Sequence, residues 1–343
     1  MCEADCQKLD VMSPQDANLD SLTFAAYLSK NNASPIAIEI ATIWTRAMLG
    51  QEPTAISALF FLNYCKSGGG LLQMRSDRKD GGQYLRMRQG TQFISTSLAA
   101  SLPAQTLKLS SPVSSITQLS PNKIAVTTTA HKTYHAKKVI LSVPTPIYKT
   151  ISFTPPLPYT KTLLSNSAVY GYYTKVMILF TTAFWVEKGY CGLAQSFTGP
   201  ASVIRDTSDP AAGKHILTCF LAGSLGTSWS RLPPSERTSV LLSQIADMWM
   251  DSDKKAVESG FIEAVACEWT QEEYSGWGCP CTSFAPGVLG SAGGALRESV
   301  GGVHFVGTET AGEWKGYMEG AVRSGERGAD DVVCALRREQ ARL

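Results

Sequence analysis

Hydrophobic and polar positions in the first part of the chain follow the period of helices. Apolar residues recur every three to four positions, with polar residues between them. This spacing predicts helices over residues 22–28, from Pro35 to Gly50, and from Thr54 to about Lys66. Asn18 or Asp20 can cap the first helix. Ser34-Pro35 opens the second, with proline at the position where its missing N–H costs least.

The third predicted helix is apolar nearly all round, so we expect it to be buried. It stops at Gly68-Gly69-Gly70. A triple glycine can belong to a phosphate-binding loop, but no G-x-G-x-x-G or Walker pattern follows this one. A flexible helix stop is therefore the favoured interpretation.

From Thr106 onward the pattern changes to the period of strands. It predicts a meander over residues 107–109, 113–119, 124–128 and 134–143. Pro144, Pro146 and the FTPPLP run at 153–158 follow, and proline-rich extended segments cannot continue a sheet. We interpret this proline-rich stretch as a crossing between domains.

The next region mixes both periods. It predicts strands over 172–180, 215–222 and 264–269 and a helix over 235–249. Lys175 stands inside the first of these strands, among apolar residues. Because burying an unpaired lysine is costly, Lys175 lies at a sheet edge, extends its charged end to solvent, or has a function.

The segment Gly301–Ala329 organises the C-terminal part. It predicts a buried strand over 303–306, a Gly-rich turn, and a helix that starts near Gly316. The apolar positions with helical spacing are Met318, Ala321, Val322, Gly325, Ala329, Val332, Val333 and Leu336. The small residues in this helix indicate close packing, and its first-turn N–H groups suit an anionic or electron-rich ligand.

Length, composition and charge narrow the class of protein. A chain of 343 residues can bury a large core and form two domains. With 31 basic and 29 acidic residues spread evenly, it carries no strong field that would favour nucleic acid or acidic lipid. No apolar run is long enough to span a bilayer. The alternation of helical and strand periods predicts an α+β fold.

The cysteines indicate reduced thiols. Their number, nine, is odd, and they are scattered in a sequence with no signal peptide, so we expect an intracellular compartment. Cys279-Pro280-Cys281 could suggest a metal site, but no second Cys or His pair stands at ligand spacing. We therefore expect no metal.

Four segments resemble the flavin-dependent monoamine oxidase family. They are the C-terminal GTET, W-x-G-Y-M-E-G-A and S-G-E-R-G-A motifs at 307–329, SALFFLNYCKSGGG at 57–70, SPVSSI at 111–116, and FTPPLP at 153–158. The resemblance implies FAD as cofactor and a two-domain flavin amine oxidase-like fold. That fold has an FAD-binding domain and a substrate domain built on a mixed sheet.

The C-terminal motifs imply part of the flavin site. By resemblance, Tyr317 forms one wall of an aromatic cage beside the flavin and contacts substrate. The first helical turn faces the pyrimidine end of the isoalloxazine ring. The cofactor-binding residues implied here are Gly307, Thr308, Glu309, Tyr317 and Met318.

Other motifs place further residues by resemblance. Gln83, after two glycines, stands where the family has a substrate-site Gln, and the Val113 backbone would hold the adenine end of FAD. The family lysine that corresponds to Lys175 bonds through water to flavin N5 and assists the reaction with oxygen. The resemblance therefore favours a catalytic role for Lys175.

Trp269 and Cys279 complete the implied cofactor contacts. A family Trp shortly before Y-S-G packs by the flavin, which suggests Trp269, and the family Cys that is bonded to the flavin corresponds to Cys279. This sequence departs here: Trp277 is an extra residue, and Pro280 replaces the second cage aromatic. Attachment at Cys279, a closer thiol at Cys281, and an unattached flavin all stay open.

The largest departure is the absence of the G-x-G-x-x-G fingerprint that grips the FAD pyrophosphate. We therefore expect a partial FAD-binding domain whose N-terminal Rossmann βαβ unit is missing from this sequence. The predicted divisions are helical substrate domain 1–87, FAD-binding part 88–164, substrate sheet 165–272, FAD-binding part 273–338 and tail 339–343.

The implied function is FAD-dependent oxidative deamination of a small amine to an imine and aldehyde, with reduction of oxygen to hydrogen peroxide. A flavin oxidase acting on polyamines or a biosynthetic intermediate is an alternative. A truncated, inactive remnant or binding partner is another. Ala341-Arg342-Leu343 has the form of a peroxisomal address, which predicts a peroxisomal and otherwise cytoplasmic protein. Whether the chain forms a homodimer stays open.

Overall fold

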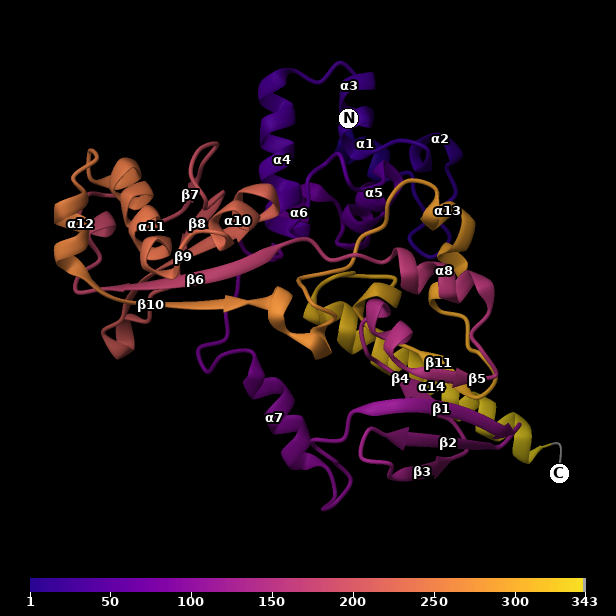
Figure 1. Cartoon of the computed structure of the whole chain (residues 1–343). Helices are drawn as coiled ribbons and strands as arrows, with labels where there is room; N and C mark the ends of the chain where they lie inside the picture. Colours follow the sequence, from indigo (N-terminus) through magenta and orange to yellow (C-terminus); the bar gives the residue numbers. More distant parts are fainter. Residues whose placement is uncertain (342–343) are drawn as a thin grey trace. The chain divides into compact units, whose positions relative to one another are not determined.

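The computed structural model describes residues 1–341, and the chain divides into two compact units. Unit 1 comprises Met1–Ala17, Phe61–Ser167 and Val288–Leu343, and unit 2 comprises Asn18–Phe60 and Ala168–Gly287. The predicted address Ala341-Arg342-Leu343 extends into residues 342 and 343, which lie outside the described part. Mixed helices and sheets in both units agree with the α+β prediction (Figure 1).

Unit 1 is built around two small sheets and the long C-terminal helix (Figure 1). In the four-stranded sheet, of order β3-β2-β1-β5, β1 pairs antiparallel with β2 and parallel with β5. In the two-stranded sheet, β11 pairs parallel with β4. The elements wholly in unit 1 are α1 (Cys2–Cys6), α6 (Leu71–Arg75), α7 (Gln92–Ser101), β1 (Val113–Ser120), β2 (Lys123–Thr128), β3 (Thr133–Ala136), β4 (Val139–Leu141), η1 (Thr145–Thr150), β5 (Ser152–Thr154), α8 (Tyr159–Ser167), α13 (Val288–Ala292), η5 (Gly293–Leu296), β11 (Val303–Phe305), η6 (Thr308–Thr310) and α14 (Met318–Gln340).

Unit 2 is built on a five-stranded antiparallel sheet of order β10-β6-β9-β8-β7, with helices on one face (Figure 1). Its elements are α3 (Phe24–Lys30), α4 (Pro35–Leu49), β6 (Tyr173–Phe180), α9 (Phe184–Glu187), β7 (Ala194–Gln195), β8 (Val203–Asp206), η2 (Pro210–Ala212), β9 (His215–Ala222), α10 (Gly223–Ser230), α11 (Pro234–Trp249), α12 (Lys254–Gly260), β10 (Phe261–Glu268), η3 (Trp269–Gln271) and η4 (Glu273–Ser275). Two short helices, α2 (Ala17–Asp20) and α5 (Ala58–Ser67), run across the unit boundaries.

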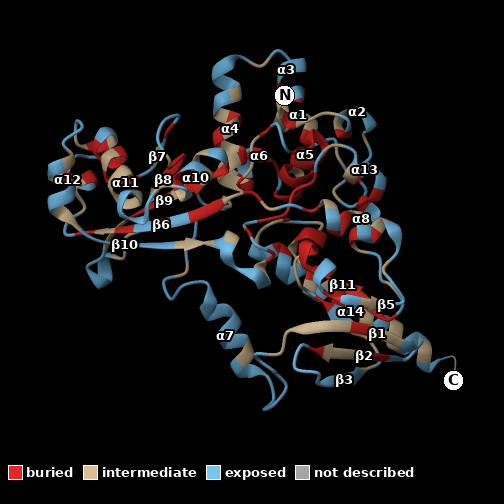
Figure 2. Cartoon of the chain, viewed as in Figure 1, coloured by how far each residue is buried: buried red, intermediate tan, exposed pale blue. Residues whose placement is uncertain are grey.

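Most predicted elements are confirmed, several within one or two residues. Strand β9 has the predicted bounds, and α4 begins after the Ser34 cap and ends at Gly50 in the left-handed conformation. Helix α5 is buried along almost its whole length, as its apolar pattern predicted, and is largely red in Figure 2. The first cap prediction was wrong, because Thr23 caps α3 by accepting from the Ala26 N–H at 3.1 Å. Asp20 instead accepts from the buried Ser57 hydroxyl.

Two strand predictions were wrong in their extent. Residues 107–109 form no strand, and Ser110 directly after them has a φ of +51°, which an extended strand cannot accommodate. The predicted strand 134–143 is divided in two at Lys137-Lys138. Its first half, β3, pairs with β2, while its second half, β4, pairs with β11 in the other sheet.

The proline-rich stretch 144–158 stays inside unit 1 and contains β5, which extends the four-stranded sheet. The division between the units falls later, between Ser167 and Ala168. The predicted helical segment 1–87 is also divided, since residues 18–60 fall in unit 2 and the remainder in unit 1. Within residues 1–341, no helix combines the length and the apolarity needed to cross a membrane.

Close packing of α14 explains how its strand-turn-helix segment folds. The buried positions of α14 are Gly320, Ser324 and Gly328, four residues apart on one face. The Ser324 hydroxyl accepts from the Gly307 N–H at 3.0 Å, and a Cβ at Gly328 would lie 2.3 Å from Val306. The small residues therefore do pack closely, as predicted, whereas the apolar positions Met318 and Val322 are more than half exposed.

Lys161 on α8 is fully buried in unit 1. Its ammonium donates to the carbonyl oxygens of Ala295 and, at 2.8 Å, Glu298, and it lies 3.7 Å from the centroid of the Phe305 ring. Burial is the main influence on this group and lowers the pKa of Lys161 to about 8. The Lys161 side chain thereby links the η5 turn to β11, the strand that precedes α14.

We expect the unfolding free energy, measured relative to a Lys161→Met variant, to rise between pH 8 and 10.5. The unfolded lysine holds its proton up to 10.5, whereas the folded one releases it near 8, so raising the pH across this window favours the folded state. The contribution is complete above 10.5 and is lost as the pH falls through about 8. At ~1.4 kcal/mol for each pH unit, the difference in unfolding free energy between the parent and the variant should change by about 3 kcal/mol across this window. Urea unfolding of both proteins tests this, and a gap independent of pH would contradict the buried ammonium.

Candidate functional site

The predicted GTET motif forms a tight turn between β11 and α14 in unit 1. Gly307 has a φ of +120°, a conformation that L side chains rarely adopt, which explains glycine here. The Thr310 N–H and hydroxyl both donate to the Gly307 carbonyl, at 2.9 and 2.8 Å. Glu309, in the middle of this turn, is 6% exposed.

Thr308 connects this turn to the start of α14. Its hydroxyl accepts from the Gly316 N–H at 2.7 Å and donates to the Tyr317 carbonyl at 2.9 Å. Tyr317 is the N-cap residue, and its side chain makes no capping hydrogen bond. The first N–H groups of a 23-residue helix, with the positive end of its dipole, therefore follow directly after Tyr317.

Aromatic side chains surround the Tyr317 ring. The Tyr64 ring lies nearly parallel to it, with centroids 6.4 Å apart and an interplanar angle of 25°. The Trp314 ring meets it edge-on at 5.4 Å. The exposed Gln83 amide donates to the Tyr317 hydroxyl at 3.4 Å and to the Met74 carbonyl at 3.2 Å. The structure thus brings together two residues predicted 234 positions apart, Gln83 and Tyr317.

Val113, the predicted adenine contact, begins β1. The register of β1 against β2 shifts between Val113 and Ser115. Val113 is partly buried and packs against the core of the four-stranded sheet. It lies on a different element from the GTET turn and the Tyr317 loop, so its cofactor role stays a prediction from the resemblance.

The residues at the start of α14 fit one end of a flavin. A helix N-terminus without a side-chain cap offers N–H donors to an electron-rich ring edge, and the Tyr317 hydroxyl and Gln83 amide are uncharged polar groups beside it. Gly307 leaves room where a Cβ would lie 3.3 Å from a Glu309 carboxylate oxygen. This arrangement suits the isoalloxazine end of FAD. The sequence contains no G-x-G-x-x-G loop for the pyrophosphate.

Three predicted residues lie in unit 2, around the C-terminal end of β10. Lys175 on β6 is the cross-strand partner of Cys267 on β10, and Trp269 follows two residues later in η3. The charge of Lys175 influences the Cys279 thiol, so these two side chains lie near each other. Lys175, Cys267, Cys279 and Trp269 therefore belong to one region of unit 2.

Lys175 does not lie at a sheet edge. Strand β6 pairs with β10 on one side and β9 on the other. Its Thr174, Val176 and Ile178 side chains are buried, whereas Lys175 and Met177 are exposed on the opposite face. The Lys175 ammonium lies 5.2 Å from the centroid of the Phe220 ring, a cation–π distance. Alternation along the strand thus explains a lysine amid apolar neighbours, and its catalytic role stays a prediction.

The two candidate thiols for flavin attachment differ in their surroundings. Cys281 is 1% exposed and donates weakly to the Thr282 carbonyl at 3.4 Å. Cys279 is partly buried, and burial raises its pKa to about 12, although the nearby Lys175 charge acts in the opposite direction. Because the thiolate is the reactive form, this environment disfavours spontaneous chemistry at Cys279.

We expect Cys279 to react slowly with iodoacetamide, because its pKa near 12 leaves almost no thiolate at neutral pH. Cys191 and Cys334 are exposed free thiols and should be modified first. Mass spectrometry of peptides after timed alkylation of the folded chain measures this order. Modification of Cys279 as fast as Cys191 would contradict the raised pKa.

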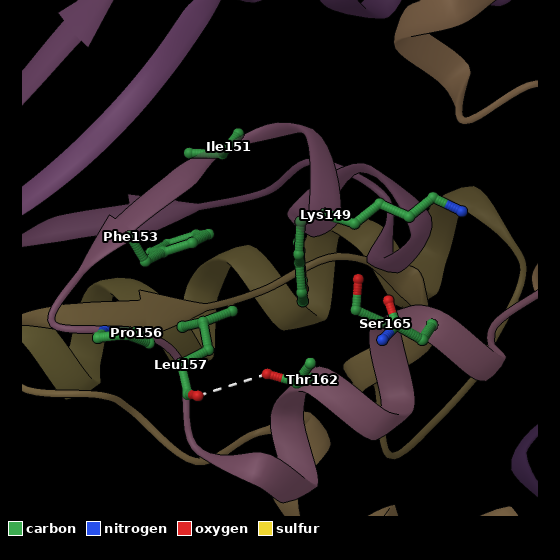
Figure 3. Close-up of a pocket in the computed structure, with 9 residues that line it drawn as sticks. Lys149, Ile151, Phe153, Pro156, Leu157, Thr162 and Ser165 are labelled. Atoms are coloured by element: carbon green, nitrogen blue, oxygen red, sulfur yellow. Dashed lines mark hydrogen bonds between the residues drawn. The ribbon is translucent and has the colours of Figure 1, made fainter.

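A separate pocket of about 190 Å³ lies in unit 1 (Figure 3). Phe153, Pro156 and Leu157 form an apolar side, and Ser165 and Thr162 on α8 a polar one. Figure 3 shows the Lys149 side chain extending away from Phe153 and Leu157. None of the predicted site residues lines this pocket, so it is no part of the candidate flavin site.

Several residues around Tyr317 were missed from the sequence. Tyr64 was assigned only to a buried helix face, and Trp314 only to the family motif. Lys315 and Asn63, which bond to each other at 2.8 Å, were not considered. Asn63 was the available signal, because an amide in the middle of an otherwise apolar helix needs a hydrogen-bond partner.

A family model matches the chain over residues 9–333. Its description is flavin containing amine oxidoreductase. FAD, the cofactor predicted from the sequence, is the cofactor of this family.

Curated relatives share about a third of their residues with the chain. A flavin-containing amine oxidase of Danio rerio is 33% identical over 326 residues, covering 94% of this chain and 61% of the relative. A probable flavin-containing monoamine oxidase A of Dictyostelium discoideum is 33% identical over 315 residues, covering 91% of this chain and 67% of the relative. The chain thus spans about 61% of the length of the zebrafish relative.

Solved structures of amine oxidases share the fold. Cyclohexylamine oxidase from Brevibacterium oxydans superposes with a TM-score of 0.87 at 27% identity, covering 98% of this chain and 73% of that one. A putrescine oxidase double mutant gives a TM-score of 0.89 at 24% identity, with coverage of 97% and 73%. The predicted flavin amine oxidase-like fold is therefore confirmed for the segment present.

Proposed function

Because the chain belongs to the flavin-containing amine oxidoreductase family, we propose that it takes part in FAD-dependent oxidation of a small amine, with oxygen as electron acceptor and hydrogen peroxide as product. The observation that supports this most is the arrangement around Tyr317. Its ring is held by two aromatic neighbours and one amide, directly before the N-terminus of a long helix.

Bound FAD would supply the two-electron oxidation that converts the amine to an imine, which water then hydrolyses. The residues of this chain bind and orient. The α14 N-terminus offers N–H donors to an electron-rich ring edge, and the Tyr317 ring provides an apolar wall for the amine. Tyr64, Trp314 and Gln83 around it carry no formal charge, so we favour a neutral monoamine over a polyamine.

We propose separate tasks for the residues of unit 2. Lys175 is exposed on its sheet face with its Nζ next to an aromatic ring, which suits assistance to oxygen chemistry. Trp269 is 37% exposed beyond the end of β10 and has free ring surface for stacking. For Cys279 we favour an unattached flavin, because its raised pKa opposes thiolate formation.

Purified chain, incubated with FAD and a panel of primary amines and polyamines, tests the proposal. Oxygen consumption coupled to hydrogen peroxide, with monoamines preferred, supports it. Preference for polyamines would move the assignment to that class. A chain that binds FAD, seen as a perturbed flavin spectrum, yet oxidises no amine would contradict the proposed activity. Failure to bind FAD at all would favour an inactive remnant or binding partner.

A further inference from the structure

Lys315 is a buried lysine two residues before Tyr317. It is only 3% exposed, and its ammonium donates to the Asn63 side-chain oxygen at 2.8 Å. Asn63 lies on α5 and is fully buried. A lysine nitrogen buried this deeply needs hydrogen-bond acceptors in fixed places, and the Asn63 oxygen is one of them. A pair of this kind indicates a requirement for a defined geometry.

The orientation of the Asn63 amide is fixed from its other end. Its NH₂ group donates to the carbonyl oxygens of Asp10 and Val11, at 3.3 and 3.4 Å. With both contacts made by the nitrogen, the amide oxygen is directed to Lys315. The N-terminal segment, α5 and the loop before α14 are therefore joined through one side chain.

Ser67, one helical turn after Asn63, holds the same loop at a second point. Its carbonyl accepts from the Trp314 N–H at 2.8 Å, and its hydroxyl accepts from the Lys315 N–H at 3.1 Å. The hydroxyl also donates to the Tyr64 carbonyl at 2.7 Å. Asn63 and Ser67, four residues apart, thus bind the loop from one face of α5.

Tyr64 lies between these two anchors, and its ring is the one stacked against Tyr317. The loop from Trp314 to Tyr317 is short, so fixing Lys315 fixes where the Tyr317 ring can stand relative to Tyr64. We propose that Lys315 and Asn63 are positioning residues that set the Tyr317 ring in place. Their importance for amine oxidation rests on the proposed function, whereas the ring position is a property of unit 1 itself.

Fluorine NMR tests the ring position without cofactor or turnover. The full chain carries 3-fluorotyrosine at position 317 alone. We expect a single narrow resonance in the parent protein and a shifted or broadened one in Lys315→Met and Asn63→Leu, because the loop loses its anchor. Asn63→Asp keeps an oxygen acceptor for the ammonium but loses the donors to Asp10 and Val11, so its resonance should lie closer to that of the parent than the Asn63→Leu resonance does.

Lys66→Met is the matched control. Lys66 is on the same helix but bonds to Gln7, so this variant should keep the parent resonance. A Lys315→Met resonance identical to the parent would overturn the proposal, as would an equal change in Lys66→Met. If Lys315→Met does not fold by circular dichroism, Asn63→Leu and Asn63→Asp carry the same comparison from the other partner, and equal spectra of those two would overturn it.

Kinetics then separate this inference from the proposed function. In FAD-loaded protein, Lys315→Met should lower kcat/KM by about 10- to 100-fold, the cost of a displacement near 1 Å, and Asn63→Asp should lower it less than Asn63→Leu. If the parent oxidises no amine, the proposed function fails, but the fluorine spectra still decide whether Lys315 positions Tyr317. If the parent is active and Lys315→Met matches it in both measurements, the positioning role alone fails.

Discussion

Replacing Tyr317 with alanine should lower kcat/KM for amine oxidation by about 100-fold, because the amine loses the ring that orients it. The ring is held on three sides, by Tyr64, Trp314 and Gln83, so no neighbour can move into its place without breaking its own contacts. Tyr317→Phe keeps the ring and loses only the long hydrogen bond from Gln83, so it should stay within about tenfold of the parent.

Steady-state kinetics of FAD-loaded protein, followed by peroxide release, measure this difference. Tyr159→Ala is the matched control, because Tyr159 is a highly exposed tyrosine at the start of α8 in unit 1. Equal losses in Tyr317→Ala and Tyr317→Phe would assign the effect to the hydroxyl and not to the ring. An unchanged Tyr317→Ala would remove Tyr317 from the proposed site.

The helical and strand periods predicted most elements because they depend on local burial. In β6 the alternation between a buried and an exposed face places Lys175 outward on an interior strand, whereas the continuous apolar run after Lys175 did not show which face it would take. Residues 107–109 alternate in the same way but form no strand. A strand needs extended backbone and a neighbouring strand to pair with. Residues 107–109 pair with no strand, and the backbone of Ser110, directly after them, is not extended.

The buried face of α14 could not be predicted from apolarity. The larger apolar side chains, such as Met318 and Val322, mark a stripe that is exposed in the described part of the chain. What selects the buried face is the absence of side chains at Gly320 and Gly328, which lets the Trp314 backbone approach the helix at Gly320 and the Val306 side chain approach it at Gly328. Apolar periodicity measures transfer from water, whereas close approach depends on what lies opposite, and that is known only from the fold.

The candidate site was predicted to the extent that its residues lie in motifs. Gln83 and Tyr317 come from separate motifs, and the structure joins them through a hydrogen bond. Tyr64, Asn63 and Lys315 act through contacts across the sequence, between α5 and the loop before α14, and neither segment alone shows the pairing. An unpaired polar residue in an apolar helix indicates that a partner exists but not where it lies.

Gly320→Ala should destabilise the chain, although alanine is the better helix former. A Cβ at Gly320 would lie 2.3 Å from the Trp314 carbonyl oxygen, 2.9 Å from its carbon and 3.0 Å from the Thr308 hydroxyl. The two Trp314 atoms are backbone atoms of the loop that carries Tyr317, and they cannot rotate away as the end of a flexible side chain can. Overpacking of this kind costs ~1–3 kcal/mol, which exceeds the ~1 kcal/mol that alanine gains in a helix.

Gly325→Ala, in the same helix, should have the opposite effect on stability. A Cβ there meets nothing within 4 Å, so the substitution should stabilise the chain by ~0.5–1 kcal/mol through helix propensity alone. Urea unfolding of the parent and both variants measures whether each substitution lowers or raises the unfolding free energy. If Gly320→Ala were as stable as Gly325→Ala, the close approach of α14 to the Trp314 carbonyl would be wrong. The same close approach holds the start of α14 against the Tyr317 loop, so Gly320→Ala should also disturb the Tyr317 fluorine resonance, which Gly325→Ala should leave unchanged.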